Sequence, residues 1–136
     1  MKKVFNIWNW AILLTLCIGI SSCSKEDDEI RGLIVGKWQL VEIIVNEDYN
    51  HNWPPCTFEM WWEFKNNGNF TQYDPCDIET PVINTIWTLD GNTLTPYLDE
   101  DRPYKWALTV LLVNKSELIV KFQEDGLTTE RFVRIQ

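Results

Sequence analysis

Short runs of alternating apolar and polar residues, each closed by a turn, constrain the fold of this chain more than any other feature. Residues 57–64 alternate cleanly, as a two-sided strand does. Asp90-Gly91-Asn92 between two such runs is typical of a hairpin turn. From residue 36 onward no run keeps the 3.6-residue period of a helix. The predicted strands are residues 36–45, 57–64, 70–73, 82–89, 93–97, 105–113, 117–122 and 127–135.

These runs predict an all-β architecture in which each strand is antiparallel to the next. A meander of this length must close on itself or leave edge strands unpaired, and eight strands suit a small barrel. We therefore predict an up-and-down barrel of about eight antiparallel strands, with a β-sandwich as the alternative. A short helix is expected over residues 30–35, before Gly36.

The N-terminus has the pattern of a secretory signal. Lys2 and Lys3 precede an apolar core over residues 11–20, which is too short to cross about 30 Å of hydrocarbon as a helix. Ile20-Ser21-Ser22-Cys23 resembles the lipobox of bacterial lipoproteins. The resemblance implies that Cys23 is lipidated and that the chain is cut just before it. Ordinary cleavage near Ser22, with an incidental cysteine, is the alternative.

An acidic run, Ser-Lys-Glu-Asp-Asp-Glu, follows at residues 24–29 and predicts a solvated tether. It resembles the tags that direct lipoproteins to the outer face of the outer membrane in a large group of Gram-negative bacteria. A plain hydrophilic spacer is the alternative. We expect a protein held at the bacterial outer membrane by its lipid anchor. The sequence does not decide between the inner face of that membrane and the outer face, at the cell surface. The expected segments are a signal peptide (1–22), the lipidated cysteine with its tether (23–31) and the β-domain (32–136).

Net charge and cysteine content limit which ligands and cross-links are expected in the mature chain. Loss of Lys2 and Lys3 leaves 10 basic residues against 20 acidic ones, which argues against nucleic acid. Cys56 and Cys76 flank a hairpin whose turn lies at residues 65–69, so the two cysteines should face each other at its open end. An oxidising periplasm or cell surface permits a disulfide between them. A metal site is the rival interpretation, but two cysteines and one histidine are a poor ligand set.

Four short motifs resemble the lipocalin-like domain of small bacterial lipoproteins. The resemblance covers about residues 32–136, and it implies a barrel whose Trp38 plugs the closed end and stacks on a basic side chain of the last strand. Either Arg131 or Arg134 could supply that side chain. The short loops imply a shallow cup. The motifs are Gly36-Lys37-Trp38, Phe64-Lys65-Asn66-Asn67-Gly68-Asn69-Phe70, the hairpin from Ile86 to Leu94, and Arg131-Phe132-Val133-Arg134.

Aromatic residues suggest two functions for such a barrel. Trp62, Trp87 and Phe122 are expected to face inward and to contact a small apolar ligand, since pocket walls are mostly apolar. Trp61 should face outward, and the loop with Trp53 could extend that surface. An exposed indole often marks a contact site. The alternative function is therefore an envelope interaction or scaffold protein that meets a protein or glycan, unless another segment covers Trp61.

Catalysis and metal binding have little support in the sequence. His51 has no obvious nucleophile to activate, and we interpret it as a solvated loop residue. Glu59 and Glu63 are four residues apart on the predicted strand, roughly 13 Å, too far for a glycosidase pair. The acidic residues 99–101 lack the spacing of a calcium loop. We therefore predict no enzyme, no metal and no cofactor.

Overall fold

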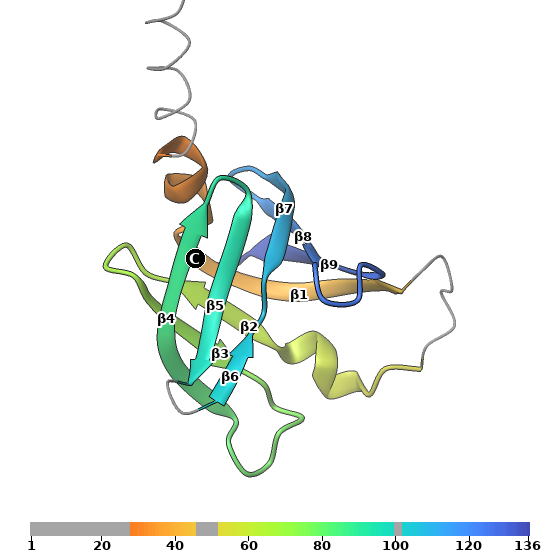
Figure 1. Ribbon diagram of the computed structural model, residues 1–136. Helices are drawn as coiled ribbons and strands as arrows, with labels where there is room; N and C mark the ends of the chain where they lie inside the picture. The colour runs from red at the N-terminus through yellow and green to blue at the C-terminus, as the bar shows by residue number, and fades with distance from the viewer. Residues whose placement is uncertain (1–27, 46–51, 100–101) are drawn as a thin grey trace, which may run out of the picture.

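The computed structural model describes residues 28–45, 52–99 and 102–136. Residues 28–34 are helical and lead into a sheet of antiparallel strands (Figure 1). The strands are β1 (Gly36–Val45), β2 (Trp61–Phe64), β3 (Asn69–Tyr73), β4 (Val82–Asp90), β5 (Thr93–Asp99), β6 (Arg102–Lys105), β7 (Leu108–Val113), β8 (Glu117–Phe122) and β9 (Thr128–Arg134).

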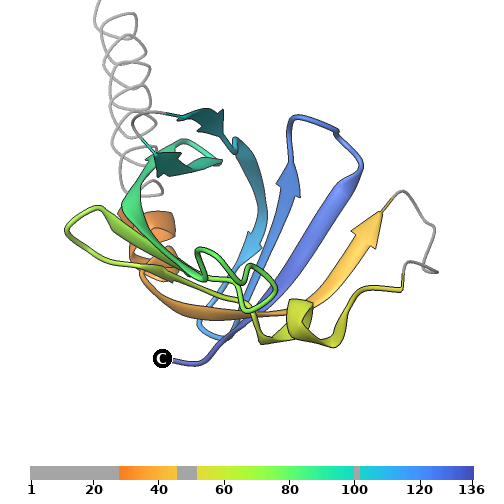
Figure 2. The ribbon, with the colours of Figure 1, turned by 90° about the horizontal axis from the view of Figure 1, so that it is seen from below.

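The sheet closes into the predicted barrel. Strand order runs β4-β3-β2-β1-β9-β8-β7-β5, and pairing of β4 with β5 completes the ring. Each strand of this 8-strand ring pairs with the ring strand that follows it in the chain, and the last strand, β9, pairs with the first, β1, as an up-and-down barrel requires. Among the strands that the structure describes, β6 pairs with β5 alone and stands outside the ring. Figure 2 looks at the ring from below, with the helix behind it.

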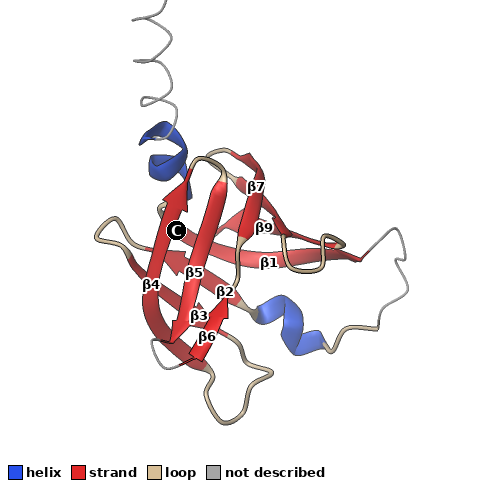
Figure 3. Ribbon diagram, in the orientation of Figure 1, coloured by secondary structure: helices blue, strands red, loops and turns tan. Residues whose placement is uncertain are grey.

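Two of the predicted strands differ from the observed ones by more than two residues at one end. The prediction for residues 57–64 was wrong in its first half, because Pro55–Glu59 forms a 3-10 helix, η1, and β2 begins only at Trp61 (Figure 3). Prolines fix φ and donate no backbone hydrogen bond, and Thr57 N–H donates instead to the carbonyl of Pro54. Phe58 is consequently 36% exposed and does not face inward. The run predicted over residues 105–113 is divided between β6 and β7.

The barrel has two different ends. At the helix end, residues 28–34 lie against the β2–β3 and β7–β8 turns: Arg31 donates to the carbonyl of Asn66, and Arg134 joins Leu33 to Lys115. Antiparallel connectivity places the β3–β4 and β8–β9 connections at the opposite, far end (Figure 1). The core between them is mostly aromatic and aliphatic: Ile34, Trp38, Leu40, Trp62, Phe64, Phe70, Trp87, Leu94, Leu108, Leu118, Val120 and Phe132.

The predicted disulfide between Cys56 and Cys76 is confirmed. It joins η1 to the segment after β3, with the two Cα atoms 5.5 Å apart. Both cysteines therefore lie beyond the strands of the β2–β3 hairpin and tie its outer segments together.

Removal of this bridge should destabilise the protein moderately. Closing a loop of this length restricts the unfolded chain by about 3 kcal/mol. Because the bridged segments lie outside the barrel strands and can relax, we expect the Cys56→Ala/Cys76→Ala variant to lose about 2 kcal/mol in urea unfolding. Reduction of the wild type should produce the same loss and have no effect on the variant. Equal stability of the oxidised and reduced wild type would contradict this.

Candidate ligand-binding site

Trp38 closes the helix end of the barrel. Its side chain is fully buried, and its indole N–H donates to the carbonyl of Ile34, 2.8 Å away. The guanidinium of Arg134 lies 4.2 Å from the centre of the Trp38 ring and donates to the carbonyls of Leu33 and Val35. Helix, first strand and last strand thus meet on one tryptophan, and Arg134 is the basic residue that stacks on it.

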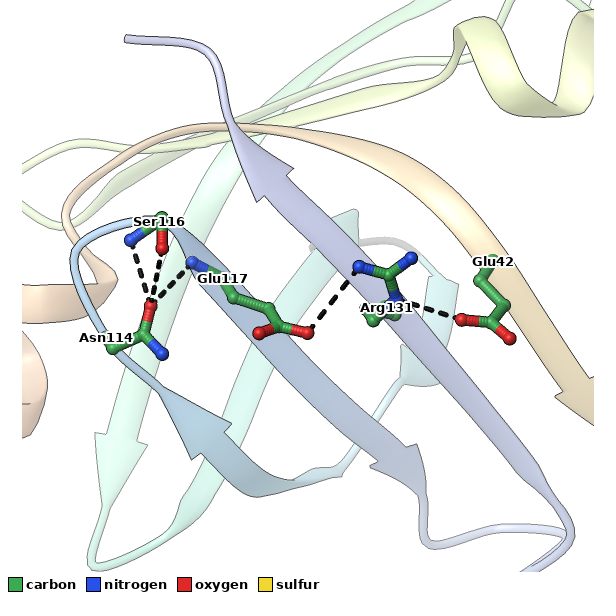
Figure 4. A network of polar contacts seen from close by, with 5 residues as sticks. All are labelled: Glu42, Asn114, Ser116, Glu117 and Arg131. Atoms are coloured by element: carbon green, nitrogen blue, oxygen red, sulfur yellow. Dashed lines mark hydrogen bonds and ion pairs between the residues drawn. The ribbon is translucent and has the colours of Figure 1, made fainter.

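Arg131 occupies the other face of β9. Side chains alternate along a strand, and Phe132 is buried, so Arg131 points outward. It bridges Glu42 on β1, 2.9 Å away, and Glu117 on β8, 3.5 Å away (Figure 4). Both carboxylates raise the pKa of Arg131, with the hydrogen bond to Glu42 contributing most. The same figure shows Asn114 holding the β7–β8 turn through its contacts with Ser116 and Glu117.

Trp87 belongs to the helix end as well. Its indole N–H donates to the carbonyl of Lys65 at 2.9 Å, and the guanidinium of Arg31 lies 4.3 Å from its ring centre. Phe64 joins it to Trp62 through edge contacts of 5.3 and 6.2 Å between ring centres. Phe122 lies apart from this pair and packs on Trp106, at 5.9 Å. The structure therefore brings together two of the three residues predicted to contact a ligand, and the ligand contacts themselves stay a prediction.

Three polar atoms lie buried in the barrel with no hydrogen-bond partner among the described residues: Trp62 Nε1, Gln72 Oε1 and Glu130 Oε2. Trp62 is 1% exposed, Gln72 5% and Glu130 8%. Buried polar atoms in proteins are nearly always hydrogen-bonded, so each of these three atoms requires a partner that the described residues do not supply. Burial raises the pKa of Glu130 to about 7.

Strand register connects these three side chains. Trp62 on β2 is paired with Gln72 on β3, so both point into the barrel as direct neighbours. The Trp62 ring packs on Phe132, with 4.4 Å between the ring centres. Glu130 precedes Phe132 by two positions on β9 and points to the same side. Gln72 and Glu130 each lie one or two residues from the strand end at the far end of the barrel.

Sequence analysis missed Gln72 and Glu130, although a signal was present. Gln72 lies two positions after Phe70 on β3, and Glu130 lies two positions before Phe132 on β9, so each polar residue shares the face of a buried phenylalanine. A polar residue at an otherwise apolar inward position is the pattern of a polar anchor in an apolar wall. Strand alternation, counted from Phe70 and from Phe132, places Gln72 and Glu130 on the inward face.

The two tryptophans predicted on the outer face have different surroundings. Trp61 is half-buried, stacks with Tyr73 at 5.5 Å, and has the ammonium of Lys37 3.8 Å from its ring centre. Neighbouring strands β1 and β3 thus cover it. Trp53, before η1, is 39% exposed. A role of either residue in partner contact stays a prediction.

Several residues considered in the sequence analysis lie outside the residues that the structure describes. Cys23, His51 and the acidic pair at 100–101 are outside the described ranges. Within those ranges, no group of three or more His, Cys, Asp or Glu side chains is placed to hold a metal ion. Nor does any helix there have the length and apolar character needed to cross a membrane.

Comparison with known proteins supports the architecture. A family model described as a lipocalin-like domain matches residues 34–120. The crystal structure of a lipocalin-like protein from Bacteroides uniformis is 17% identical, with a TM-score of 0.58 over 76% of this chain and 99% of that one. A DUF4847 family protein from Bacteroides vulgatus is 14% identical, with a TM-score of 0.50 over 74% and 93% of the two chains. At these identities the likeness is one of fold. No curated protein matches the sequence.

Proposed function

The chain belongs to the lipocalin-like domain family, whose model matches more than half of its length, and from this premise we infer that its barrel binds a small, mainly apolar molecule. The observation that carries this proposal is the set of unpaired polar atoms on Trp62, Gln72 and Glu130 inside an otherwise apolar core. An apolar wall with a few convergent polar groups is the usual composition of a small-molecule site.

The far end of the barrel is the proposed point of access. Trp38, Arg134 and residues 28–34 occupy the helix end through buried hydrogen bonds and ring contacts. Gln72 and Glu130 lie toward the opposite strand ends. A ligand that enters from the far end would therefore meet the polar groups before it reaches the aromatic core around Phe64.

Native mass spectrometry of the full chain tests ligand binding directly. We expect a discrete added mass that is released by organic extraction, and a smaller occupancy in a Gln72→Leu/Glu130→Leu variant. The Glu63→Gln variant, altered on the outer face of β2, should retain the added mass. If the wild type carries no added mass and binds none of a panel of aliphatic and aromatic alcohols, amines and acids, the proposed function is wrong.

A lipid anchor at Cys23 would hold the helix end of the barrel close to the membrane. Support for the anchor comes from the lipobox-like Ile20-Ser21-Ser22-Cys23 and the acidic residues after it. An extended chain spans at most about 3.6 Å per residue, so Cys23 lies within about 18 Å of residue 28, where the described helix begins. In this proposal the helix end faces the outer membrane and the far end faces away from it.

Replacement of the anchoring cysteine tests that arrangement. Because the acyl chains provide the membrane affinity, we expect Cys23→Ala to move most of the protein from the membrane fraction to the soluble fraction. The Cys17→Ala variant, altered within the signal, should remain with the membranes. Fractionation followed by immunoblotting measures the distribution. If Cys23→Ala stays as membrane-bound as the wild type although its mass shows that the signal peptide has been removed, the lipid anchor is excluded.

A further inference from the structure

The chemistry of the unpaired atoms indicates what kind of polar group the barrel accepts. Gln72 Oε1 is an acceptor, and Glu130 Oε2 is an acceptor whenever the carboxyl group is ionised. Trp62 Nε1–H is a donor only. A complementary ligand group therefore donates to one or both of these oxygens, and it gains a further contact if it also accepts from the indole.

Neither strand partner of Glu130 carries a cation. Its strand neighbours are Ile43 on β1 and Val120 on β8, both apolar. The charged residues nearest to it in the ladder, Arg131 and Lys121, occupy alternate positions and point outward. A buried carboxylate without a partner is costly, and a second carboxylate brought next to it would be repelled.

We propose that the barrel selects ligands that turn a hydroxyl or amine group toward Glu130 and Gln72, and that it disfavours ligands ending in a carboxylate. A hydroxyl group donates its one hydrogen to the Glu130 or the Gln72 oxygen and accepts from Trp62, so it pairs with two of the three side chains. An amine satisfies the two acceptors and adds charge pairing with Glu130. This inference rests on the proposed function, since it names the ligand class of the same site.

Three probes with one alkyl chain isolate the head group. Octan-1-ol, octylamine and octanoate should be titrated into the full chain at pH 7.5 by isothermal calorimetry. We expect octan-1-ol and octylamine to bind at least tenfold more tightly than octanoate. In Glu130→Gln the carboxylate is lost, so octylamine should weaken and octanoate should strengthen, each by several-fold. In Glu63→Gln, on the outer face, all three affinities should match the wild type.

The outcomes separate this inference from the function on which it rests. If octanoate binds the wild type as well as the other two probes, or if Glu130→Gln leaves the octylamine and octanoate affinities unchanged, the selectivity is wrong while ligand binding stands. If none of the three probes binds and the full chain carries no copurified ligand, the proposed function fails and this inference with it. A reversal of the order toward octanoate in Glu130→Gln supports both.

Discussion

Replacement of Trp38 with alanine should lower the free energy of unfolding by about 4 kcal/mol. Truncation of a fully buried tryptophan removes its transfer free energy and leaves a cavity, which together cost about 3–5 kcal/mol. The variant also loses the hydrogen bond to the Ile34 carbonyl and the ring beneath Arg134. Because small domains are stable by only about 5–15 kcal/mol, much of the stability depends on this one side chain.

Trp38→Phe is the matched control for this loss. It keeps an aromatic ring beneath Arg134 but lacks the indole N–H, so the Ile34 carbonyl loses its donor. We expect a loss of about 1–2 kcal/mol, the cost of an unsatisfied buried group. Urea unfolding followed by circular dichroism measures both variants. Losses below about 1 kcal/mol in Trp38→Ala would show that the helix and the last strand are held together by other contacts.

The closed barrel could be predicted because its determinants are local. Alternating runs and turn residues define strands, and a continuous antiparallel meander of this length has few ways to pair its edges. Cys56 and Cys76 could be paired because a hairpin fixes which residues face each other across it. In each case one short turn determines which residues of the two adjoining strands lie opposite each other.

Features that depend on irregular backbone could not be predicted. The prolines before Cys56 favour η1 over a longer strand, and alternation alone does not show where a 3-10 turn replaces a strand. Irregular pairing after Leu40 on β1 and after Val110 on β7 shifts the register, so alternation counted from one end of a strand fails at the other. The choice of Arg134 over Arg131 needed the inward position of Phe132 to be known first.

Glu130 should affect the free energy of unfolding even without a ligand. Burial raises its pKa from 4.5 to about 7 in the folded protein. Between these values the folded chain holds a proton that the unfolded chain has released, so the contribution of Glu130 to stability falls as the pH rises from about 4.5 to 7. The difference amounts to about 3 kcal/mol above pH 7. Glu130→Gln should therefore be more stable than the wild type by about that amount at pH 8, and nearly equal to it at pH 4.5.

Urea unfolding of both proteins at half-unit steps from pH 4.5 to 8 measures this difference. Subtraction of the two curves removes every group that they share, including the exposed carboxylates. The control is Glu63→Gln, whose stability should follow the wild type within about 0.5 kcal/mol throughout, as surface changes usually do. An amine ligand that donates to Glu130 would reduce the advantage of Glu130→Gln at pH 8, because it binds the ionised wild type more tightly than the variant and so stabilises the wild type more. If Glu130→Gln is less stable than the wild type at pH 8 in the absence of ligand, the carboxylate has a partner inside the barrel, and the site does not require one from the ligand.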